Sequence, residues 1–421
     1  MSPIPESALH RSMTAQLTRR QANSSLRSLT LSPATSIDFS SNDFLSLSSS
    51  SLLRTSFLSS LCAVPNFRLG STGSRLLDGN SPYAEQLERE IAAFHHAPAA
   101  VLFNSGFDAN AGFFACVPQK DDVIVYDALI HASVHEGMRV SRVPPERRRP
   151  FRHNCLESLR LCLEDARASE TEKRGVFVAV ESLYSMDGDL APLAAIVDLV
   201  EEIFPDGNAH IIVDEAHSTG IYGSKGRGLV CSLGLEDRIF ARLHTFGKAL
   251  GCNGAILLCD ELTRSYLINY ARPLIYTTFM SFPSLAAIKA AYTLLQSGAT
   301  ERRAEKLQEL IQLLYTKLQT PLLRREDAGY GLLTIPHQIP KSPIFSILSP
   351  RPKELAKWCQ EAGFVVRAIV SPTVPVGTER IRVCLHAENS AEEIERLVGT
   401  MQRWVEMQGE KQKKVVRESR L

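Results

Sequence analysis

Short apolar runs alternate with helix-like stretches between about residues 98 and 260. Each run is rich in Val, Ile, Leu, Ala or Phe, and the stretches between the runs place apolar residues at helical spacing. This alternation predicts an α/β fold with a mainly parallel sheet, of about seven strands, that is covered by helices. The runs are Ala99 to Phe103, Val123 to Tyr126, Val176 to Val180, His210 to Val213, Ile239 to Leu243 and Gly254 to Leu258.

The last third of the chain has a different pattern. The spacing of apolar residues predicts a charged amphipathic helix over 299–318, and residues 335–343 have the composition of a turn or linker. A strand is predicted over Ile381 to Leu385, followed by a helix that Ser390 and Glu393 open as a capping box. The pattern therefore predicts an N-terminal arm over 1–50, a large domain over 51–295, a smaller α+β domain over 296–408 and a tail over 409–421.

Composition narrows the class of protein. The 421 residues contain 47 basic and 46 acidic side chains, a net charge of +1, so the chain has no general attraction for nucleic acid. No run reaches the ~18 apolar residues of a membrane span. The nine cysteines form no CxxC pair and no cysteine/histidine cluster with metal spacing. We expect a soluble protein with reduced thiols that binds neither nucleic acid nor a membrane, and no metal site.

Both ends of the chain carry possible targeting signals. Residues 1–37 contain one acidic residue, Glu6, beside four arginines and many serines, which is typical of a mitochondrial transit peptide. The alternative is an amphipathic arm that belongs to the folded protein. At the other end, Ser419-Arg420-Leu421 is a conservative variant of the Ser-Lys-Leu address. It predicts a peroxisomal location and a peroxisomal import receptor as partner, with the cytoplasm as the alternative.

Polar residues follow the predicted strands where those strands end. Ligands of open α/β sheets bind at this carboxyl edge. After the first run, Asn104-Ser105-Gly106-Phe107 leads into a helix start, whose free amides suit a phosphate. The later runs lead to His131, to Glu181, Ser182 and Ser185, to Asp214-Glu215-Ala216-His217, and to His244-Thr245-Phe246-Gly247-Lys248.

Pyridoxal phosphate is the cofactor that requires this set of groups. It needs a lysine for its Schiff base, a carboxylate for its ring nitrogen, a flat group over the ring and a phosphate site. Asp214 suits the ring nitrogen because a nearby carboxylate favours its charged form. Lys248 follows Asp214 by 34 residues (248 minus 214), which leaves room for a crossover and another strand.

Two other classes of protein are alternatives to a pyridoxal-phosphate enzyme. Asp214-Glu215-Ala216-His217 also spells the DEAH box of helicase-type ATPases, but the chain has no Walker A loop, and Gly247-Lys248 is followed by Ala249 rather than Ser or Thr. A scaffold that lacks activity is disfavoured because both the lysine and the aspartate are present.

An ordered series of motifs resembles the α-oxoamine synthases, fold-type I pyridoxal-phosphate enzymes that condense an amino acid with an acyl-CoA and release CO₂. The resemblance runs from about residue 15 to 405. Within the family, residues 371–382 and 274–278 resemble the branch that makes 8-amino-7-oxononanoate. The motifs are Asp38 to Leu45, Gly79-Asn80, Tyr184 to Asp189, Val213 to Gly220 and Thr245 to Ala249.

The resemblance implies a role for each residue of the site. Lys248 would bond the cofactor and act as the base, Asp214 would hold the ring nitrogen, and His131 would stack on the ring. The cofactor would further be contacted by Ser185 and His217 on its ring oxygen, by Gly106, Phe107 and Thr245 on its phosphate, and by Thr277 or Thr278 from the neighbouring subunit of a homodimer. The substrates would be bound by Arg382, which is suited to a carboxylate, and by His131, Arg27 and Thr373.

The resemblance also implies the substrates, which are L-alanine and pimeloyl-CoA. The runner-up is a sister enzyme that uses glycine or serine with another acyl-CoA or a carrier-bound chain, since one methyl group changes binding by only about 1 to 3 kcal/mol. Val370 and Ala84 depart from the bacterial pattern of this branch. Because Arg27 falls in the family's N-terminal helix, the resemblance favours an arm that stays part of the enzyme.

Overall fold

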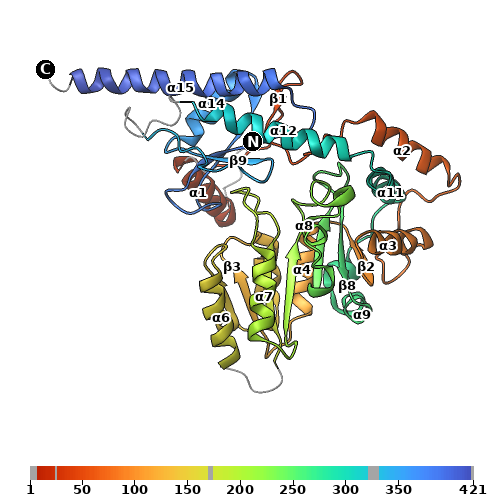
Figure 1. Ribbon diagram of the computed structural model, residues 1–421. Coiled ribbons are helices and arrows are strands. Elements are labelled where there is room, and N and C mark those ends of the chain that lie inside the picture. The colour runs from red at the N-terminus through yellow and green to blue at the C-terminus, as the bar shows by residue number, and fades with distance from the viewer. Residues whose placement is uncertain (1–6, 24–25, 169–173, 321–330, 419–421) are drawn as a thin grey trace. The chain divides into compact units, whose positions relative to one another are not determined.

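The computed structural model describes residues 7–23, 26–168, 174–320 and 331–418 (Figure 1). The chain divides into two compact units, Met1–Ser36 and Ile37–Leu421. The first unit contains α1 (Ala8–Ala22), whose residues are all exposed. Ser7 caps this helix by accepting a hydrogen bond from the amide of His10. The predicted boundaries at residues 50, 295 and 408 stay predictions.

A seven-stranded sheet forms the centre of the second unit. All neighbouring strands pair in parallel except β8, which pairs antiparallel with β2 and with β7. This confirms the predicted α/β fold with a mainly parallel sheet. The order across the sheet is β2 (Ala99–Phe103), β8 (Ala255–Cys259), β7 (Ala241–Thr245), β6 (Ala209–Asp214), β5 (Val176–Glu181), β3 (Val123–Asp127) and β4 (Arg148–Phe151).

The sequence pattern missed β4, and the reason is its composition. Arg148, Arg149 and Pro150 form no apolar run, yet they pair with β3 at the edge of the sheet. An edge strand has one neighbour and stays partly open to water, so it can carry charged side chains and a proline.

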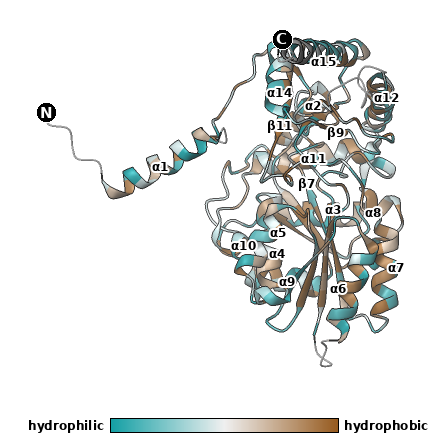
Figure 2. Cartoon of the chain, turned by 90° about the vertical axis from the view of Figure 1, so that its left-hand side faces the viewer, coloured by the Kyte–Doolittle hydropathy of each residue, from teal (hydrophilic) through white to brown (hydrophobic). Residues whose placement is uncertain are grey.

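Each face of the sheet is buried under helices, as Figure 2 shows. Alternate residues of a strand point to opposite faces. In β5, Val178 therefore packs with one layer of helices and Phe177 with the other. The first layer contains α6 (Leu156–Ala168) and α7 (Leu193–Ile203), and the second contains α4 (Gly106–Cys116), α5 (Ala132–Val140), α9 (Glu261–Tyr270) and α10 (Arg272–Tyr276).

A smaller antiparallel sheet and long helices form the rest of the second unit. The three strands lie in the order β11 (Arg367–Ile369), β12 (Arg380–Cys384) and β9 (Ile344–Leu348). The short β1 (Ile37–Asp38) pairs with β10 (Phe364–Val365). The helices that share the largest core cluster with them are α2 (Ser51–Cys62), α3 (Pro82–Phe94), α11 (Phe282–Ser297), α12 (Glu301–Leu318), α14 (Pro352–Glu361) and α15 (Ala391–Glu418).

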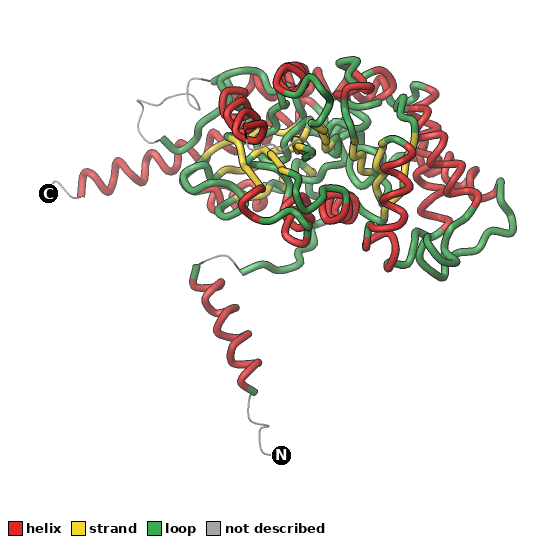
Figure 3. The backbone as a smooth tube through the Cα atoms, turned by 90° about the horizontal axis from the view of Figure 1, so that it is seen from below, coloured by secondary structure: helices red, strands yellow, loops and turns green. Residues whose placement is uncertain are grey.

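The start of α15 is the predicted capping box. The amide of Ser390 donates to Glu393 Oε2 at 3.0 Å, and the amide of Glu393 donates to Ser390 Oγ at 3.2 Å. Figure 3 shows this long helix running to the C-terminal end of the described chain. The predicted helix over 299–318 is also present, as α12. Within the described ranges, no helix is both long enough and apolar enough to span a membrane.

Candidate functional site

A cavity of about 280 Å³ lies at the carboxyl edge of the large sheet. The parallel strands bring the ends of β6 and β7 to this edge, and with them Asp214 and Thr245. The cavity also takes side chains from the starts of α4 and α5. Seven residues predicted for the cofactor site line it, namely Gly106, Phe107, His131, Asp214, His217, Thr245 and Lys248.

One end of the cavity has the features of a phosphate site. Ser105 caps α4 by accepting from the amide of Asp108, so the first amides of the helix, including those of Gly106 and Phe107, are left for an anion. A Cβ on Gly106 would lie 2.4 Å from Thr245 Cγ2, so only glycine fits here. Within the described chain, the buried Thr245 Oγ1 has no hydrogen-bond partner.

Asp214 is held in place from both sides. Its Oδ2 accepts from Asn110 Nδ2 at 2.8 Å, and its Oδ1 accepts from the amide of Ala216 at 2.9 Å. Asn110 also donates to Ser133 Oγ at 3.0 Å. The sequence analysis missed Asn110. It lies four residues after Gly106 on α4, and this spacing puts both residues on the same face of the helix.

Lys248 is partly buried and lies near two carboxyl groups. Burial lowers the pKa of its amine, and Asp214 and Glu181 partly oppose that effect. Burial, with Asp214 next, raises the pKa of Glu181 well above its usual value. Glu181 lines the same cavity, but the sequence analysis gave it no role. A partly buried lysine with a lowered pKa is suited to act as a nucleophile and as a base.

Two histidines flank this cavity. His131 Nδ1 accepts from the amide of Ser133 at 3.2 Å and lies 2.7 Å from Ser133 Oγ. Burial lowers the pKa of His131, although Asp214 opposes it, and burial also lowers the pKa of His217, with Lys248 as the next cause. His217 Nδ1 is buried without a partner in the described chain. Neutral rings and unpaired polar atoms of this kind fit the ring and ring oxygen of pyridoxal phosphate.

Arg382 and Ser185 lie next to the cavity rather than on its wall. Arg382, from β12, donates through Nε to the carbonyl oxygen of Ser185 at 2.6 Å and through Nη2 to Asn42 Oδ1 at 2.8 Å. Asn42 does line the cavity. The predicted roles of the Ser185 hydroxyl and of Arg382 stay predictions.

The remaining predicted residues are not part of the cavity wall. The carbonyl oxygen of Thr278 accepts from Asn104 Nδ2 at 2.7 Å, just before α4. Thr373 is exposed in the turn after β11, and Thr277 is also exposed. Arg27 belongs to the first unit and lies after the end of α1, so the prediction that it falls in the N-terminal helix is wrong. Their predicted contacts with substrate or with a second subunit therefore stay predictions.

His153 fixes the segment that carries Ser185. Its Nδ1 lies 2.8 Å from Asp127 Oδ1, at the end of β3, and its Nε2 lies 2.9 Å from Asp189 Oδ2. The amide of Tyr184 donates to the carbonyl oxygen of Asp189, which closes the turn around Ser185. Burial alone would lower the pKa of His153, but the two carboxylates outweigh burial and raise it to about 10. His153 is therefore a charged bridge at neutral pH.

Replacing His153 by asparagine is expected to reduce the free energy of unfolding by on the order of 1 to 2 kcal/mol at pH 6, because two carboxylates lose their shared cation, although water partly screens the pair with Asp189, which is 42% exposed. The pKa of His153 is higher in the folded state than in the unfolded state. The stabilisation is therefore complete below about pH 6.5 and is lost as the pH rises through about 10. Urea unfolding at pH 6 and pH 10 should show the difference between variant and wild type shrinking. His210→Asn is the control. For His153→Asn, an equal difference in the free energy of unfolding from wild type at both pH values would contradict the charged bridge.

Comparison with known proteins identifies the family. Residues 34–401 match the family model described as aminotransferase class I and II. The 8-amino-7-oxononanoate synthase of Emericella nidulans is 51% identical over 96% of this chain and 98% of its own length. The solved structure of the Francisella tularensis 8-amino-7-oxononanoate synthase is 26% identical with a TM-score of 0.69, covering 89% of this chain and 99% of its own. Serine palmitoyltransferase of Sphingomonas wittichii shares the fold, with a TM-score of 0.80 at 24% identity, covering 95% of this chain and 100% of its own.

These matches agree with pyridoxal phosphate as the cofactor of the site. They cover all three sheets of the second unit, and enzymes of the matched family use pyridoxal phosphate. The cofactor inferred from Asp214 and Lys248 is thereby confirmed, and the ATPase interpretation of Asp214 to His217 is set aside. The chain belongs to the class I and II aminotransferase family and, within it, to the α-oxoamine synthases.

Proposed function

We propose that the protein condenses L-alanine with pimeloyl-CoA to give 8-amino-7-oxononanoate, CoA and CO₂. The observation that carries this proposal is the 51% identity to the Emericella nidulans 8-amino-7-oxononanoate synthase over nearly the full length of both chains. The cavity supports it, because its side chains include the lysine, the carboxylate, the flat rings and the phosphate cradle that this chemistry needs.

Different residues around the cavity have different roles in the proposed reaction. Bound there, pyridoxal phosphate supplies an electron sink next to the α-carbon of the amino acid. Lys248 would hold the cofactor through its amine and would serve as the base for the α-proton, a role that its lowered pKa favours. Asp214 holds a proton at the ring nitrogen. Arg382 binds the carboxylate of the amino acid, since a guanidinium can donate to both of its oxygens.

The other cavity residues orient the cofactor. The amides of Gly106 and Phe107 and the hydroxyl of Thr245 bind the phosphate at the start of α4. His131 would hold the ring of the cofactor, and His217 Nδ1, which has no partner in the described chain, would form a hydrogen bond with the ring oxygen. Ser185 is assigned to the same oxygen, and Thr373 and Arg27 to the acyl substrate.

Substrate choice is tested by adding L-alanine, glycine and L-serine separately to the holoenzyme while its visible absorption is recorded, and then adding pimeloyl-CoA. We expect the alanine spectrum to respond to pimeloyl-CoA, with release of CoA and a product of the mass of 8-amino-7-oxononanoate. The second candidate is a sister activity with serine, as in the name of the Sphingomonas wittichii relative in fold. Product formation with serine or glycine but not alanine would favour that candidate.

A homodimer is part of the proposal. Three exposed apolar side chains lie on the cavity wall or on segments that hydrogen bonds link to the start of α4. Phe107 lines the cavity and is 47% exposed, Tyr276 is 73% exposed, and Leu69 is 72% exposed. The carbonyl oxygen of Leu69 accepts from the amide of Phe282, which links its segment to the residues after Tyr276. Such a patch is typical of a subunit interface.

Sedimentation equilibrium should give a molecular mass of twice 46.5 kDa. A monomer at micromolar concentration would contradict the proposed homodimer.

We also propose a peroxisomal location. It is supported by the Ser419-Arg420-Leu421 tripeptide, which lies outside the described residues, and by the basic residues before it. A fluorescent protein that carries the last dozen residues should enter peroxisomes through their import receptor, whereas the same fusion with Leu421 deleted should stay in the cytoplasm. Equal cytoplasmic fluorescence of the two fusions would count against the address.

A further inference from the structure

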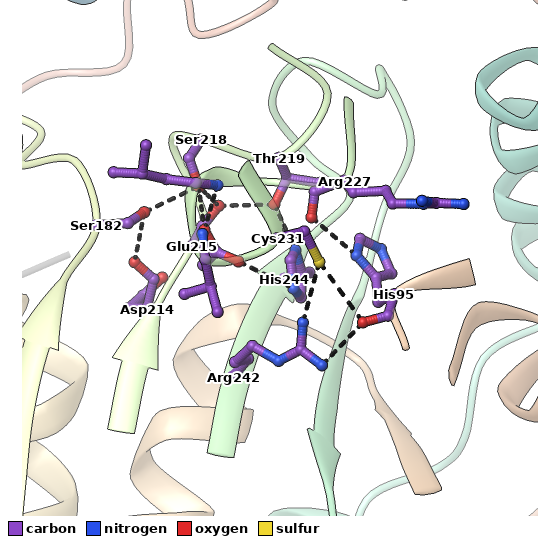
Figure 4. Close-up of polar contacts among 12 residues, drawn as sticks. His95, Ser182, Asp214, Glu215, Ser218, Thr219, Arg227, Cys231, Arg242 and His244 are labelled. Carbon is purple, nitrogen blue, oxygen red and sulfur yellow. Dashed lines mark hydrogen bonds and ion pairs between the residues drawn. The ribbon is translucent and has the colours of Figure 1, made fainter. Parts of the chain in front are cut away.

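A buried polar network adjoins Asp214, which lines the cavity (Figure 4). Glu215 follows Asp214 at the end of β6, and His244 precedes Thr245 at the end of β7. The side chains of Glu215 and His244 are both completely buried. Neither residue lines the cavity, so the mechanism above does not use them.

One oxygen of the Glu215 carboxyl group has all its partners. Oε1 accepts from the amides of Leu229 and Val230 at 2.6 and 3.0 Å, and from Ser218 Oγ at 2.9 Å. The other oxygen, Oε2, packs against the loop backbone, because a Cβ on Gly228 would lie 2.6 Å from it. Three donors at Oε1 make it the carbonyl-like oxygen of the group. A proton on Glu215 would therefore reside on Oε2.

The hydrogen bonds of Thr219 fix the tautomer of His244. Thr219 Oγ1 donates its single proton to the carbonyl oxygen of Glu215 at 2.6 Å. Toward His244 Nδ1, at 2.9 Å, the same hydroxyl must then accept. Nδ1 therefore carries a proton, and in a neutral ring Nε2 is an acceptor that needs a donor.

The two remaining atoms face each other. Glu215 Oε2 lies 3.5 Å from His244 Nε2, and neither atom has a hydrogen-bond partner elsewhere in the described chain. A shift of about half an ångström would bring them to a normal O–H···N distance. Two buried polar atoms without other partners each cost free energy unless they pair.

The surroundings favour a neutral pair over an ion pair. The ring of His95 lies 4.1 Å from that of His244, and the guanidinium of Arg242 donates to the carbonyl oxygen of His95 at 2.9 Å. A second cation on His244 would be repelled by Arg242. Burial, then His95 and Arg242, lowers the pKa of His244 well below its usual value, and burial raises the pKa of Glu215 despite Arg242.

We propose that Glu215 carries a proton on Oε2 and donates it to Nε2 of neutral His244, and that this uncharged bridge positions the two segments that hold the cofactor. Glu215 adjoins Asp214 and lies two residues before His217, whereas His244 adjoins Thr245 and lies four residues before Lys248. Glu215 and His244 are thus positioning residues that act through their neighbours. The inference rests on the proposed use of the cavity for pyridoxal phosphate, but not on the choice of amino acid or acyl-CoA.

Two variants of Glu215 separate a neutral bridge from an ion pair. In Glu215→Gln the amide oxygen can accept the three bonds of Oε1 while the amide nitrogen donates to His244 Nε2. We expect this variant to keep pyridoxal-phosphate affinity within a few-fold of wild type. In Glu215→Leu, three donors and His244 Nε2 lose their partner, and the dissociation constant of the cofactor should rise by about 10- to 100-fold. Equal losses in both variants would overturn the neutral bridge.

The matched control is a second glutamate–histidine pair, at the surface. Glu236 Oε1 lies 3.2 Å from His96 Nδ1, and the His96 side chain is 54% exposed. Glu236→Leu should leave the cofactor's dissociation constant unchanged, because exposed pairs contribute little. A loss equal to that of Glu215→Leu would show that the effect of Glu215 is not specific to the cofactor site.

The protonation states of Glu215 and His244 can be measured in the wild-type protein without any substrate. The infrared difference between wild type and Glu215→Gln, recorded on both the apo- and holoprotein, should contain the carbonyl stretch of a buried carboxylic acid. Nitrogen-15 NMR of labelled histidine should assign the proton of His244 to Nδ1. A carboxylate band together with a doubly protonated His244 would refute the proposal, even if alanine proves to be the wrong substrate.

Discussion

Lys248→Ala is expected to abolish turnover, with kcat reduced by about 10⁴-fold or more, since general-base catalysis alone contributes up to about that factor. The substitution removes the one amine that lines the cavity among the described residues, and with it both the bond to the cofactor and the group that moves the α-proton. Release of CoA from pimeloyl-CoA in the presence of L-alanine measures the loss. The variant should also lack the visible absorption that the lysine-bound cofactor gives.

The control for this experiment is Lys289→Ala. Lys289, on α11, is a partly buried lysine that pairs with Glu90 away from the cavity. Its removal changes the charge of the protein by the same amount, and we expect little effect on kcat. Substantial turnover by Lys248→Ala with alanine and acyl-CoA would disprove the assigned role of Lys248.

Asp214→Asn is expected to lower kcat by about 10- to 1000-fold, because a nearby carboxylate favours the protonated form of a base by about one to three pKa units. Asparagine is close in shape and can still accept from the amide of Ala216, so the variant should keep much of its cofactor affinity. The measurements are kcat and the change of visible absorption on adding alanine, which we expect to be lost.

Asp122→Asn provides a matched control. Asp122 is as buried as Asp214, each being 8% exposed, but it lies at the amino end of β3. It accepts from the amides of Gln119 and Gly175 at 2.7 and 2.9 Å. Its neutral variant is expected to lose stability without a selective loss of kcat. An undiminished spectral response to alanine in Asp214→Asn would argue against Asp214 as the partner of the ring nitrogen.

Much of the large sheet was predictable because its strands are buried on both faces. Buried parallel strands are continuous apolar runs, and their carboxyl ends carry the polar residues of the site. Asp214, Thr245 and Lys248 could therefore be found from strand ends alone. The predicted run over Ile239 to Leu243 began two residues before β7, since Ile239 and Phe240 are apolar but precede the paired residues.

Other features depend on contacts that no local pattern encodes. Asn110 stands among mainly apolar residues of α4, after Asp108 in its first turn, and only the fold shows that it meets Asp214. The bridge between Glu215 and His244 joins residues 29 positions apart (244 minus 215), and its protonation follows from bonds made by Thr219. The contact between Ser185 and Arg382 likewise joins a turn after β5 to a strand of the smaller sheet. Such side-chain networks follow from tertiary packing, which sequence periodicity does not determine.

The segment around Ser185 is anchored at both ends before any substrate arrives. His153 holds it to β3, and Arg380 pairs with Asp187 while Arg382 donates to the carbonyl oxygen of Ser185. The guanidinium of Arg382 has therefore lost its rotamer freedom during folding. Binding of the amino-acid carboxylate is spared an ordering cost of about 0.5 to 1.5 kcal/mol for that side chain. If Arg382 binds the carboxylate as proposed, this clamp is preorganised, and its affinity should depend on the rigidity of this segment as much as on the charge of Arg382.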